Sequence, residues 1–409
     1  MKPKLRVLFV NPLSGLGGSE RSLLDLLASL CASAPEVEPR LLLLADGELA
    51  ERARALGVPV EIAAVPPALA ALGESKASLR ELGAELPTLV RSMPTALGYV
   101  AKLRGIASEL RPRIVHTNGM KAHLLMALAV PELHRVIHLR DFASERPVSR
   151  HALPLLARRS LILTNSRAVE HDARRIAPHA RTRTVYNGID LEEFRPGSRD
   201  LEHLAALARL PVPASTATIV GMVATRAWWK GHRTFLRAVA LVRAAEPARE
   251  FRFYVVGGAI YGARGSEISE SELRQLVSEL GLADVVGLVP FQQNAAAVYR
   301  GLDIVVHPSE RPEPFGRTIV EAMATGRAVV VSRAGGAAEL FVEGESALGH
   351  QPGNPSDLAR AVLELARDEA LRARLGTAAR AEAEARFDRR RLGREVLASY
   401  GELLGSRLG

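Results

Sequence analysis

The stretch DIVVHPSERPEPFGRTIVEAMATGRAVVVS (303–332) holds the pattern that decides the fold. It consists of an apolar run, a proline-broken loop, a helical segment over 316–325, and a second apolar run, AVVVS (328–332). Gly326 follows the last helical residue, the usual position for a glycine that ends a helix. Two strands with a helix between them are typical of a right-handed β–α–β crossover in a parallel sheet.

The same alternation continues along the chain. Runs that stay apolar on both faces favour strands buried in a parallel sheet, and the helical stretches between them supply the crossovers. The predicted strand segments are LRVLFV (5–10), RLLLLA (40–45), RIVHTN (113–118), RVIHL (135–139), SLILTN (160–165), RTVYN (183–187), ATIVGMVA (217–224), FRFYVVG (251–257), DIVVH (303–307) and AVVVS (328–332). We therefore predict an α/β protein with doubly wound sheets.

A break near residues 188–216 divides these strands into two groups. Most of it, 191–216, contains three prolines and no strand pattern, and ten strands are an unusual number for one sheet. The predicted domains are 1–190 and 191–385, followed by a helical segment over 386–409. Two doubly wound domains that face each other leave a cleft at the carboxyl ends of their strands, where ligands bind in such folds.

The chain has 54 Lys+Arg against 45 Asp+Glu, a net charge of +9. This excess suits an anionic lipid surface or a phosphorylated small molecule, although an arginine-rich genome would produce the same excess. Aromatic residues make up only 4% of the chain, and it has no zinc-finger spacing, so we expect no nucleic-acid partner. The single Cys31 and the absence of any apolar stretch of membrane-spanning length favour a cytoplasmic protein.

The segment 74–111 is basic and helical, and two interpretations of it remain open. Its apolar side includes Leu97, Val100 and Leu103 and is flanked by cations such as Arg104. Such a helix can rest on an anionic membrane surface, which would make the protein peripheral at the inner membrane face. A helix packed on the surface of its own domain has the same pattern.

Two glutamates, Glu313 and Glu321, bracket the start of the helix in the opening stretch. Acidic residues near a helix start are common, so the pair alone says little. In this context, however, the free N–H groups over 316–318 would bind phosphate oxygens. Glu313 would accept hydrogen bonds from sugar hydroxyls, and Glu321 would bind a ribose diol. One helix would then contact a nucleotide sugar from its ribose to its hexose.

Two cations, Arg226 and Lys230, follow the predicted strand 217–224. At the carboxyl end of that strand they could clamp a diphosphate, although loop cations are often simply solvated. The sequence contains no Asp-x-Asp pair and no His-Glu-x-x-His motif. We therefore expect no metal site and no cofactor, with the two cations and the helix dipole in place of a divalent ion.

The glycine-rich segment NPLSGLGGSERSLLDLLASL (11–30) follows the first strand. Its glycines predict a tight turn, Ser19 is a candidate helix cap, and the helix start could face an anion. A plain strand–turn–helix is the alternative. Glu20 occupies the position of the third glycine of a dinucleotide fingerprint, which counts against a nicotinamide-dependent oxidoreductase.

Several polar residues end the predicted strands of the first domain and are candidates to bind an acceptor. Packed, purely structural histidines are the alternative for the histidines among them. These residues are His116, Asn118, His138, Arg140 and Asp141.

Taken together, these segments resemble the family-4 class of retaining glycosyltransferases, which have the two-domain GT-B fold. The matching segments follow the family order over nearly the whole chain, and the last is the most specific. They are GLGGSE (15–20), LTNSRAV (163–169), VYNGIDLEEFRP (185–196), ATRAWWKGH (224–232), VVGG (255–258) and HPSERPEPFGRTIVEAMATGRAVVVSRAGGAAEL (307–340).

The resemblance implies roles for individual residues. Arg226 and Lys230 correspond to a diphosphate clamp, Glu313 to the acid that faces the transferred sugar, and Glu321 to the ribose ligand. The C-terminal helix is expected to cross back onto the first domain, as in similar proteins. The remaining donor-site residues implied are Gly17, Gly18, Phe291 in the VPFQQN loop, Phe315, Gly316, Arg317 and Thr318.

One position departs from the family pattern. Many relatives carry a histidine directly before the aspartate that follows the RVIHL-type strand, whereas this chain has Arg140 there. His138 lies two residues earlier, and we expect it to point to the other side of the extended strand. The family's proposed catalytic histidine therefore has no counterpart that can be assigned from the sequence.

These features and the resemblance together predict a metal-independent transfer of a sugar from a nucleoside diphosphate to an acceptor hydroxyl, and the resemblance implies that the transfer is retaining. The basic first domain favours a lipid-linked or phosphorylated acceptor, and a glycan or natural-product acceptor fits the sequence nearly as well. A Rossmann-type nicotinamide oxidoreductase and a noncatalytic sugar-nucleotide-binding module remain as alternatives. Titration with reduced dinucleotide distinguishes an oxidoreductase from a transferase, and turnover of the donor distinguishes a transferase from a noncatalytic binding module.

Overall fold

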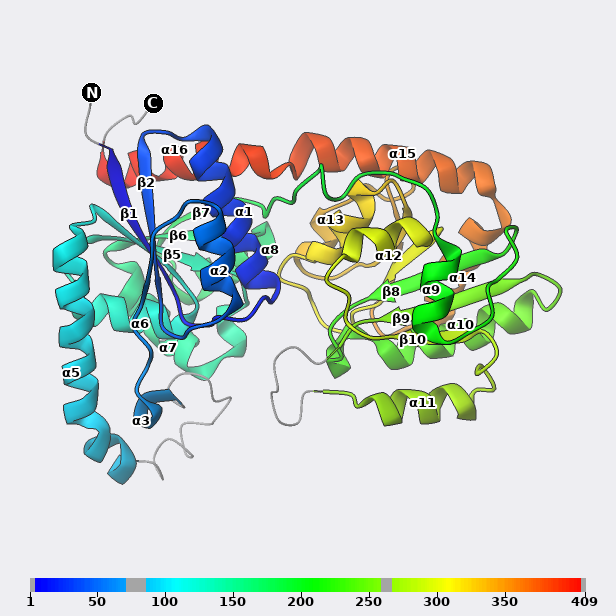
Figure 1. Ribbon diagram of the computed structural model, residues 1–409, viewed down its shortest axis with the longest axis horizontal. Helices are drawn as coiled ribbons and strands as arrows, with labels where there is room; N and C mark the ends of the chain where they lie inside the picture. The colour runs from blue at the N-terminus through cyan, green and yellow to red at the C-terminus, as the bar shows by residue number, and fades with distance from the viewer. Residues whose placement is uncertain (1–3, 71–85, 259–266, 406–409) are drawn as a thin grey trace. The chain divides into compact units, whose positions relative to one another are not determined.

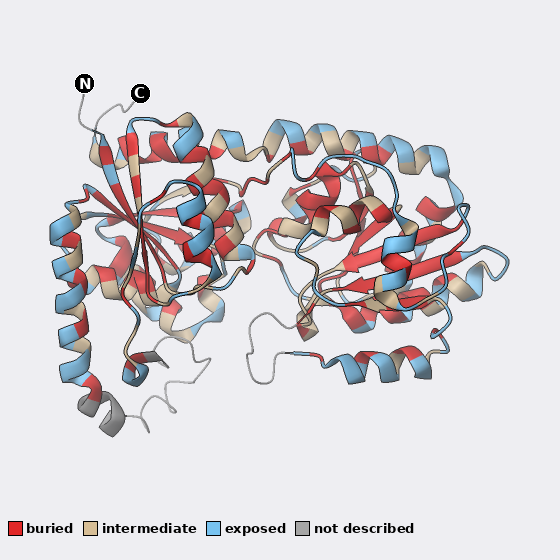
Figure 2. Ribbon diagram, in the orientation of Figure 1, coloured by how far each residue is buried: buried red, intermediate tan, exposed pale blue. Residues whose placement is uncertain are grey.

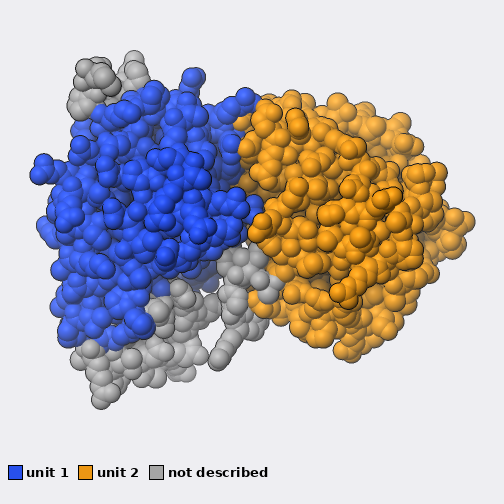
Figure 3. Space-filling view, viewed as in Figure 1, with its two compact units in different colours: residues 1–188, 389–409 blue, residues 189–388 orange. Residues whose placement is uncertain are grey.

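The computed structural model describes residues 4–70, 86–258 and 267–405. The chain forms two compact units, and unit 1 is discontinuous because it combines residues 1–188 with 389–409 (Figure 3). Unit 2 is a single stretch, 189–388. The first part of the basic segment 74–111 lies outside the described residues. Among the helices described, none is long and apolar enough to cross a membrane.

Unit 1 is built on a seven-stranded parallel sheet in the order β3-β2-β1-β4-β5-β6-β7 (Figure 1). Its middle strands are buried on both faces, as the apolar runs predict. The strands are β1 (Leu5–Asn11), β2 (Val37–Leu43), β3 (Val60–Ile62), β4 (Ile114–Asn118), β5 (His134–Leu139), β6 (Ser160–Thr164) and β7 (Arg181–Thr184).

Helices cover both faces of this sheet, and the last of them comes from the C-terminal part of the chain. That helix, α16, packs on α1 with its buried face, which includes Val396 and Tyr400. Gly393 permits the close approach, because a Cβ there would lie 2.8 Å from the Ser29 carbonyl oxygen, and its N–H donates to Ser29 Oγ at 2.8 Å. The helices are α1 (Gly18–Ser33), α2 (Glu48–Ala55), α3 (Pro67–Ala70), α5 (Leu86–Leu110), α6 (Met120–Ala129), η1 (Ala143–Glu145), α7 (Pro147–Ala157), α8 (Arg167–Ile176), η4 (Arg389–Arg391) and α16 (Leu392–Leu404).

Unit 2 has a six-stranded parallel sheet in the order β10-β9-β8-β11-β12-β13. These strands, like those of unit 1, form the buried layer between exposed helix faces (Figure 2). The strands are β8 (Thr218–Val223), β9 (Phe251–Val256), β10 (Val286–Val289), β11 (Ile304–His307), β12 (Ala328–Ser332) and β13 (Leu348–His350). The helices are α9 (Leu201–Ala208), η2 (Trp228–Lys230), α10 (His232–Ala245), α11 (Glu270–Glu279), α12 (Ala295–Gly301), α13 (Arg317–Ala324), η3 (Gly336–Glu339), α14 (Pro355–Arg367) and α15 (Glu369–Arg386).

Both sheets reverse their strand order at one place, and this places the candidate residues. In unit 1 the reversal lies between β1 and β4, and in unit 2 between β8 and β11. Ligands of open α/β sheets bind outside the carboxyl ends of the strands at such a switch point. The glycine segment follows β1, while the Arg226/Lys230 and Glu313 loops follow β8 and β11.

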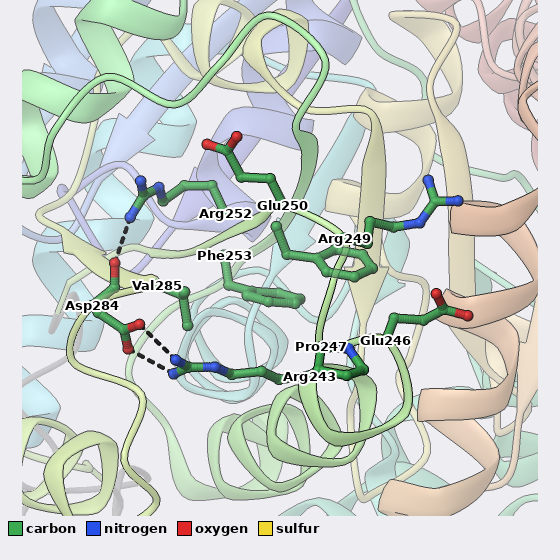
Figure 4. A pocket seen from close by; sticks show the side chains of 10 residues that line it. Arg243, Glu246, Pro247, Arg249, Glu250, Arg252, Phe253, Asp284 and Val285 are labelled. Atoms are coloured by element: carbon green, nitrogen blue, oxygen red, sulfur yellow. Dashed lines mark hydrogen bonds and ion pairs between the residues drawn. The ribbon is translucent and has the colours of Figure 1, made fainter.

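A cavity of about 280 Å³ lies at the other end of the unit 2 sheet (Figure 4). Phe251, at the amino end of β9, helps to line it. Several of its charged side chains are held within the unit: Arg243 binds both carboxylate oxygens of Asp284 at 2.6 and 2.7 Å, and Arg252 donates to the Asp284 carbonyl. We therefore treat it as a structural feature, separate from the switch point.

Buried histidines make the stability of both units sensitive to acid. Burial lowers the pKa of His123 to about 3 and those of His232 and His307 to about 4. A histidine whose pKa is lower in the folded than in the unfolded state contributes its full stability above pH 6.5, and this stability is lost as the pH falls toward the folded pKa.

We expect the urea denaturation midpoint to fall steeply between pH 6.5 and 5, because each buried histidine removes up to about 1.4 kcal/mol per pH unit. Urea titrations at several pH values measure this slope. The control His171→Gln, which changes an exposed histidine, should leave the slope unchanged. A midpoint that stays constant from pH 7 to 5 would contradict the prediction.

Candidate functional site

The loops after β8 and β11 bring Lys230 and Glu313 together in unit 2. Lys230 ends the short helix η2, and its Nζ donates to Glu313 Oε1 at 2.6 Å. Gly231 follows with a left-handed φ of +77°, which lets the chain turn directly into α10. The two predicted residues, 83 positions apart in the sequence, therefore form one partly buried ion pair.

One carboxylate oxygen of Glu313, Oε1, is held by neighbouring side chains, and the other, Oε2, is not held by any that the structure describes. Besides Lys230, Ser309 Oγ donates to Oε1 at 2.6 Å, and His307 Nε2 lies 3.8 Å from the same oxygen. The backbone is fixed as well, because Gly336 N–H donates to the Glu313 carbonyl at 2.7 Å. Glu313 Oε2 makes no hydrogen bond with any residue that the structure describes. This oxygen is available to accept from a ligand.

Charge compensation keeps the Glu313 carboxylate ionised. Burial alone would raise its pKa, but the charges of Lys230 and His307 and the hydrogen bonds from Lys230 and Ser309 lower the pKa to about 2. His307 is neutral at pH 7, since burial lowers its pKa to about 4. The site therefore holds a negative oxygen whose countercharge is a lysine, a residue that can also face a second anion.

The second glutamate is held by two donors within unit 2. Glu321 Oε1 accepts from Arg317 Nε at 2.7 Å, and its Oε2 accepts from Tyr299 Oη at 2.9 Å. Glu321 is the fifth residue of α13, and so lies about one turn into the helix. Each oxygen keeps a further lone pair for a diol, because an ionised carboxylate accepts about four hydrogen bonds.

Tyr299→Phe should lower the free energy of unfolding by about 1.5–3 kcal/mol, the usual contribution of a hydrogen bond to a charged group. The phenol is fully buried and donates to Glu321. Chemical denaturation measures the loss. Tyr254→Phe is the matched control, because the Tyr254 hydroxyl is buried without a partner among the described residues. Equal effects of the two substitutions would contradict the assigned role.

Arg226, the other predicted cation, is paired with a residue that sequence reasoning did not single out. Its NH1 donates to Glu270 Oε2 at 2.9 Å, while the other Glu270 oxygen accepts from Arg274. The Arg226 backbone N–H donates to Gly258 O after β9. Arg226 therefore lies at the same sheet edge as Lys230, with an exposed carboxylate as its counterion.

The remaining donor-site predictions fall into two groups. Phe291 follows β10 and is 44% exposed, so its ring is accessible, whereas the Phe315 ring is buried against Phe387. Only the backbone of Phe315 could therefore contact a ligand. Gly316 is the N-cap of α13 and supplies no side-chain cap, and Thr318 lies in the first turn. The start of α13 is thus suited to an anion, as the helix dipole requires.

In unit 1, the backbone of the glycine segment does not need the conformations that a tight turn would reserve for glycine. Gly17 caps α1 with a φ of −81°, which any residue can adopt. Our expectation that Ser19 caps the helix is wrong, because Ser19 lies inside α1. A Cβ added to Gly15 or Gly18 would meet no atom within 4 Å. The fold of unit 1 therefore does not itself impose these glycines, and a donor contact at Gly17 and Gly18 stays a prediction.

The strand-end residues of unit 1 are mostly buried. His116, Asn118 and His138 are at most 4% exposed, whereas Asp141 lies at the surface in an ion pair with Arg146. The prediction that His138 points away from position 140 is wrong. Alternate residues of a strand share a face, and Arg140 NH2 lies 3.4 Å from His138 Nδ1.

Three contributors to these sites were missed from sequence: Ser309, Tyr299 and Glu270. Ser309 lies four residues before Glu313, a spacing that only the folded loop turns into a contact. Tyr299 and Glu270 come from α12 and α11, and their partners lie 22 and 44 positions away. No local pattern marks such contacts.

Comparison with known proteins relates both parts of the chain to glycosyltransferases. The family model described as glycosyl transferases group 1 matches residues 211–382, and the one described as glycosyltransferase family 4 matches residues 47–193. Together the two matches take in most of the chain.

Individual relatives agree with this assignment. A D-inositol 3-phosphate glycosyltransferase of Saccharomonospora viridis is 36% identical over 56% of this chain and 52% of its own length. Another such enzyme, of Catenulispora acidiphila, is 38% identical over 44% of this chain and 41% of its own length. The chain thus spans about half the length of the curated relatives it matches.

A solved structure covers nearly the whole chain. The crystal structure of Anabaena HepE in complex with UDP is 26% identical, with a TM-score of 0.78, over 97% of this chain and all of the other. The same protein has been crystallised with UDP-glucose.

Proposed function

Since the chain belongs to the GT4-like glycosyltransferases of GT-B fold, we propose that it transfers a sugar from a nucleoside-diphosphate sugar to an acceptor hydroxyl. The transfer retains the anomeric configuration and needs no divalent metal ion. The observation that carries the proposal is the Lys230–Glu313 pair at the switch point of unit 2, with Glu313 Oε2 open. The complexes of HepE with UDP and UDP-glucose support this class of donor.

In this proposal, unit 2 binds the donor through groups already in position. Lys230 and Arg226 face the diphosphate, together with the start of α13. Glu313 Oε2 accepts from hydroxyls of the sugar, while Glu321 accepts from the ribose. Phe291 and its loop lie beside the base.

The chemistry follows from where charge develops. As the glycosidic bond breaks, the anomeric carbon becomes oxocarbenium-like and the leaving diphosphate gains negative charge. Cations held in place before the reaction stabilise that charge without reorganisation. We propose that the acceptor attacks from the face that the diphosphate leaves, and that a phosphate oxygen takes the acceptor's proton.

The charge distribution suggests an anionic acceptor on unit 1. Unit 1 contains 31 Lys+Arg against 19 Asp+Glu, whereas unit 2 contains 23 against 26. The whole basic excess of the chain therefore belongs to unit 1, where it attracts anions. We propose a phosphorylated or lipid-linked acceptor, and D-inositol 3-phosphate is the first to test because the curated relatives are named for it.

Calorimetry in EDTA with UDP, GDP, ADP and dTDP tests the donor assignment. We expect one of these nucleotides to bind, and its sugar conjugate to be turned over with an acceptor panel that pairs D-inositol 3-phosphate with inositol. The product's anomeric configuration is read by NMR. Absence of binding by all four nucleotides, or turnover that requires added magnesium, would overturn the corresponding part of the proposal.

A further inference from the structure

A chain of buried polar side chains runs through unit 1 from its C-terminal helix to the end of β5. Tyr400 Oη on α16 lies 2.7 Å from His116 Nδ1 on β4. His116 Nε2 lies 3.1 Å from His138 Nδ1 on β5, which in turn lies 3.4 Å from Arg140 NH2. Tyr400 and His116 are fully buried, and His138 is 4% exposed.

The contacts determine which atom donates at each step. Arginine can only donate, so His138 Nδ1 must accept from Arg140. His116 Nε2 must then donate to the same Nδ1, which leaves His116 Nδ1 to accept from the Tyr400 hydroxyl. The reverse order would place two donors at His138 Nδ1 and leave the buried Tyr400 hydroxyl hydrogen without an acceptor among the described residues. We infer that both histidines carry their proton on Nε2.

The two histidines of this hydrogen-bonded row, His116 and His138, are uncharged. Burial, followed by the charge of Arg140, holds the pKa of His138 well below its usual range, and burial does the same for His116. Both imidazoles are therefore neutral at pH 7, and each has one donor and one acceptor. Both Nδ1 atoms already accept hydrogen bonds within the cluster, so these contacts fix the orientation of the side chains.

Two further contacts of the Arg140 guanidinium support the same role. Its Nε donates to Asn118 Oδ1 at 3.2 Å, and its NH1 donates to Asn187 Oδ1 at 2.5 Å. With His138, three neutral acceptors on separate segments bind three different nitrogens of one planar group. A guanidinium held in this way keeps its full charge and presents it in one orientation.

A phenylalanine at position 400 would fill the same apolar space on α16 without bringing a hydroxyl into the core. Burying a polar group costs free energy unless it is hydrogen-bonded. Among the described residues, the partner of the Tyr400 hydroxyl is His116. The same cluster has a His138 Nε2 without a partner among the described residues. His138, Arg140 and Asn187 help to line a cavity of about 10 Å³, roughly the size for one water molecule.

We propose that Tyr400 is a positioning residue: through His116 and His138 it orients Arg140 for binding an anionic group of the acceptor. This rests on the proposed function, in which unit 1 binds the acceptor. It makes the C-terminal helix α16 a determinant of acceptor recognition. Arg140, in the place where relatives carry a histidine, then binds the acceptor and is not a base.

Tyr400→Phe tests the positioning directly, because it removes one hydroxyl and keeps the packing. In protein labelled with ¹⁵N-arginine and ¹⁵N-histidine, we expect the Arg140 Nε–H to exchange with solvent at least about tenfold faster. We also expect the His116 ring to lose its single tautomer. Ser399→Ala is the matched control: it removes the neighbouring buried hydroxyl, whose one hydrogen bond among the described residues is within α16, to the Glu395 carbonyl.

Kinetics with an acceptor that supports transfer test the consequence. Tyr400→Phe should raise the acceptor KM about three- to tenfold and leave the donor KM and kcat within twofold. In an Arg140→Met background, the same substitution should no longer change the acceptor KM. A purely structural Tyr400 would instead alter kcat, or alter KM equally in both backgrounds, and that result would overturn the proposal.

The exchange rates and the kinetics test the two proposals separately. If Tyr400→Phe changes the Arg140 exchange rate no more than Ser399→Ala does, the positioning is wrong whatever the enzyme transfers. If the exchange rate changes as expected but no acceptor in the panel supports transfer, the proposed function fails. The proposed role in acceptor binding then fails with it, while the orientation of Arg140 by Tyr400 stands.

Discussion

Lys230→Met should lower turnover by about 10²–10³, the usual effect of removing one preorganised charged donor from a transition state. The loss combines two causes. The leaving diphosphate loses a cation, and Glu313 loses the partner that donates to Oε1 at 2.6 Å. The pKa of Glu313, now about 2, should rise, and unfolding should become easier by about 1.5–3 kcal/mol.

Turnover of the sugar nucleotide and chemical denaturation measure these effects separately. Arg233→Met is the matched control, because Arg233 lies three residues further along in the first turn of α10, is half exposed, and pairs with Glu272 at 3.5 Å. It should change turnover less than threefold. A Lys230→Met protein that transfers sugar at the normal rate would remove Lys230 from the proposed mechanism.

Gly231→Ala should be among the most damaging single-methyl substitutions in unit 2. Its φ of +77° would cost alanine about 1–2 kcal/mol. The new Cβ would also lie 1.9 Å from the Pro308 carbonyl oxygen, so one of the two loops must move. We expect a loss of about 3 kcal/mol in unfolding free energy, and a fall in turnover, because Ser309 follows Pro308 and holds Glu313.

The control Gly281→Ala separates strain from collision. Gly281 also has a left-handed φ, +66°, but a Cβ there meets nothing within 4 Å. It should cost about 1–2 kcal/mol and leave turnover unchanged. If the two alanines are equally destabilising and equally active, the close approach of Gly231 to Pro308 does not matter for the site.

The interior strands could be predicted from sequence, and so could part of the edge strand β7, but the other three edge strands could not. Runs such as 251–257 and 328–332 are buried on both faces, so their apolar pattern is continuous. The missed strands β3, β10 and β13 each lie at the edge of a sheet and have only three or four residues. Edge strands are often short, and three or four residues are too few to show a strand pattern in the sequence.

Residue types and their order along the chain predicted that the candidate residues lie at one edge of the sheet, but not how they pair with each other and with their neighbours. Arg226, Lys230, Glu313 and Glu321 do lie after the strands that flank the switch point of unit 2. Their charges, however, are each paired within unit 2, by contacts that span from four to 83 positions. Such contacts depend on tertiary geometry, which composition and spacing do not encode.

The discontinuity of unit 1 has a consequence for how the protein is made. On the ribosome, the segment that completes this unit emerges only after all of unit 2, because α16 follows residue 388. Unit 2 is contiguous, so it can fold while the first 188 residues still await the helix that covers α1. In a chain truncated after residue 388 and held on the ribosome by a linker long enough to clear the exit tunnel, we expect unit 2 to resist proteolysis and residues 1–188 to be cleaved.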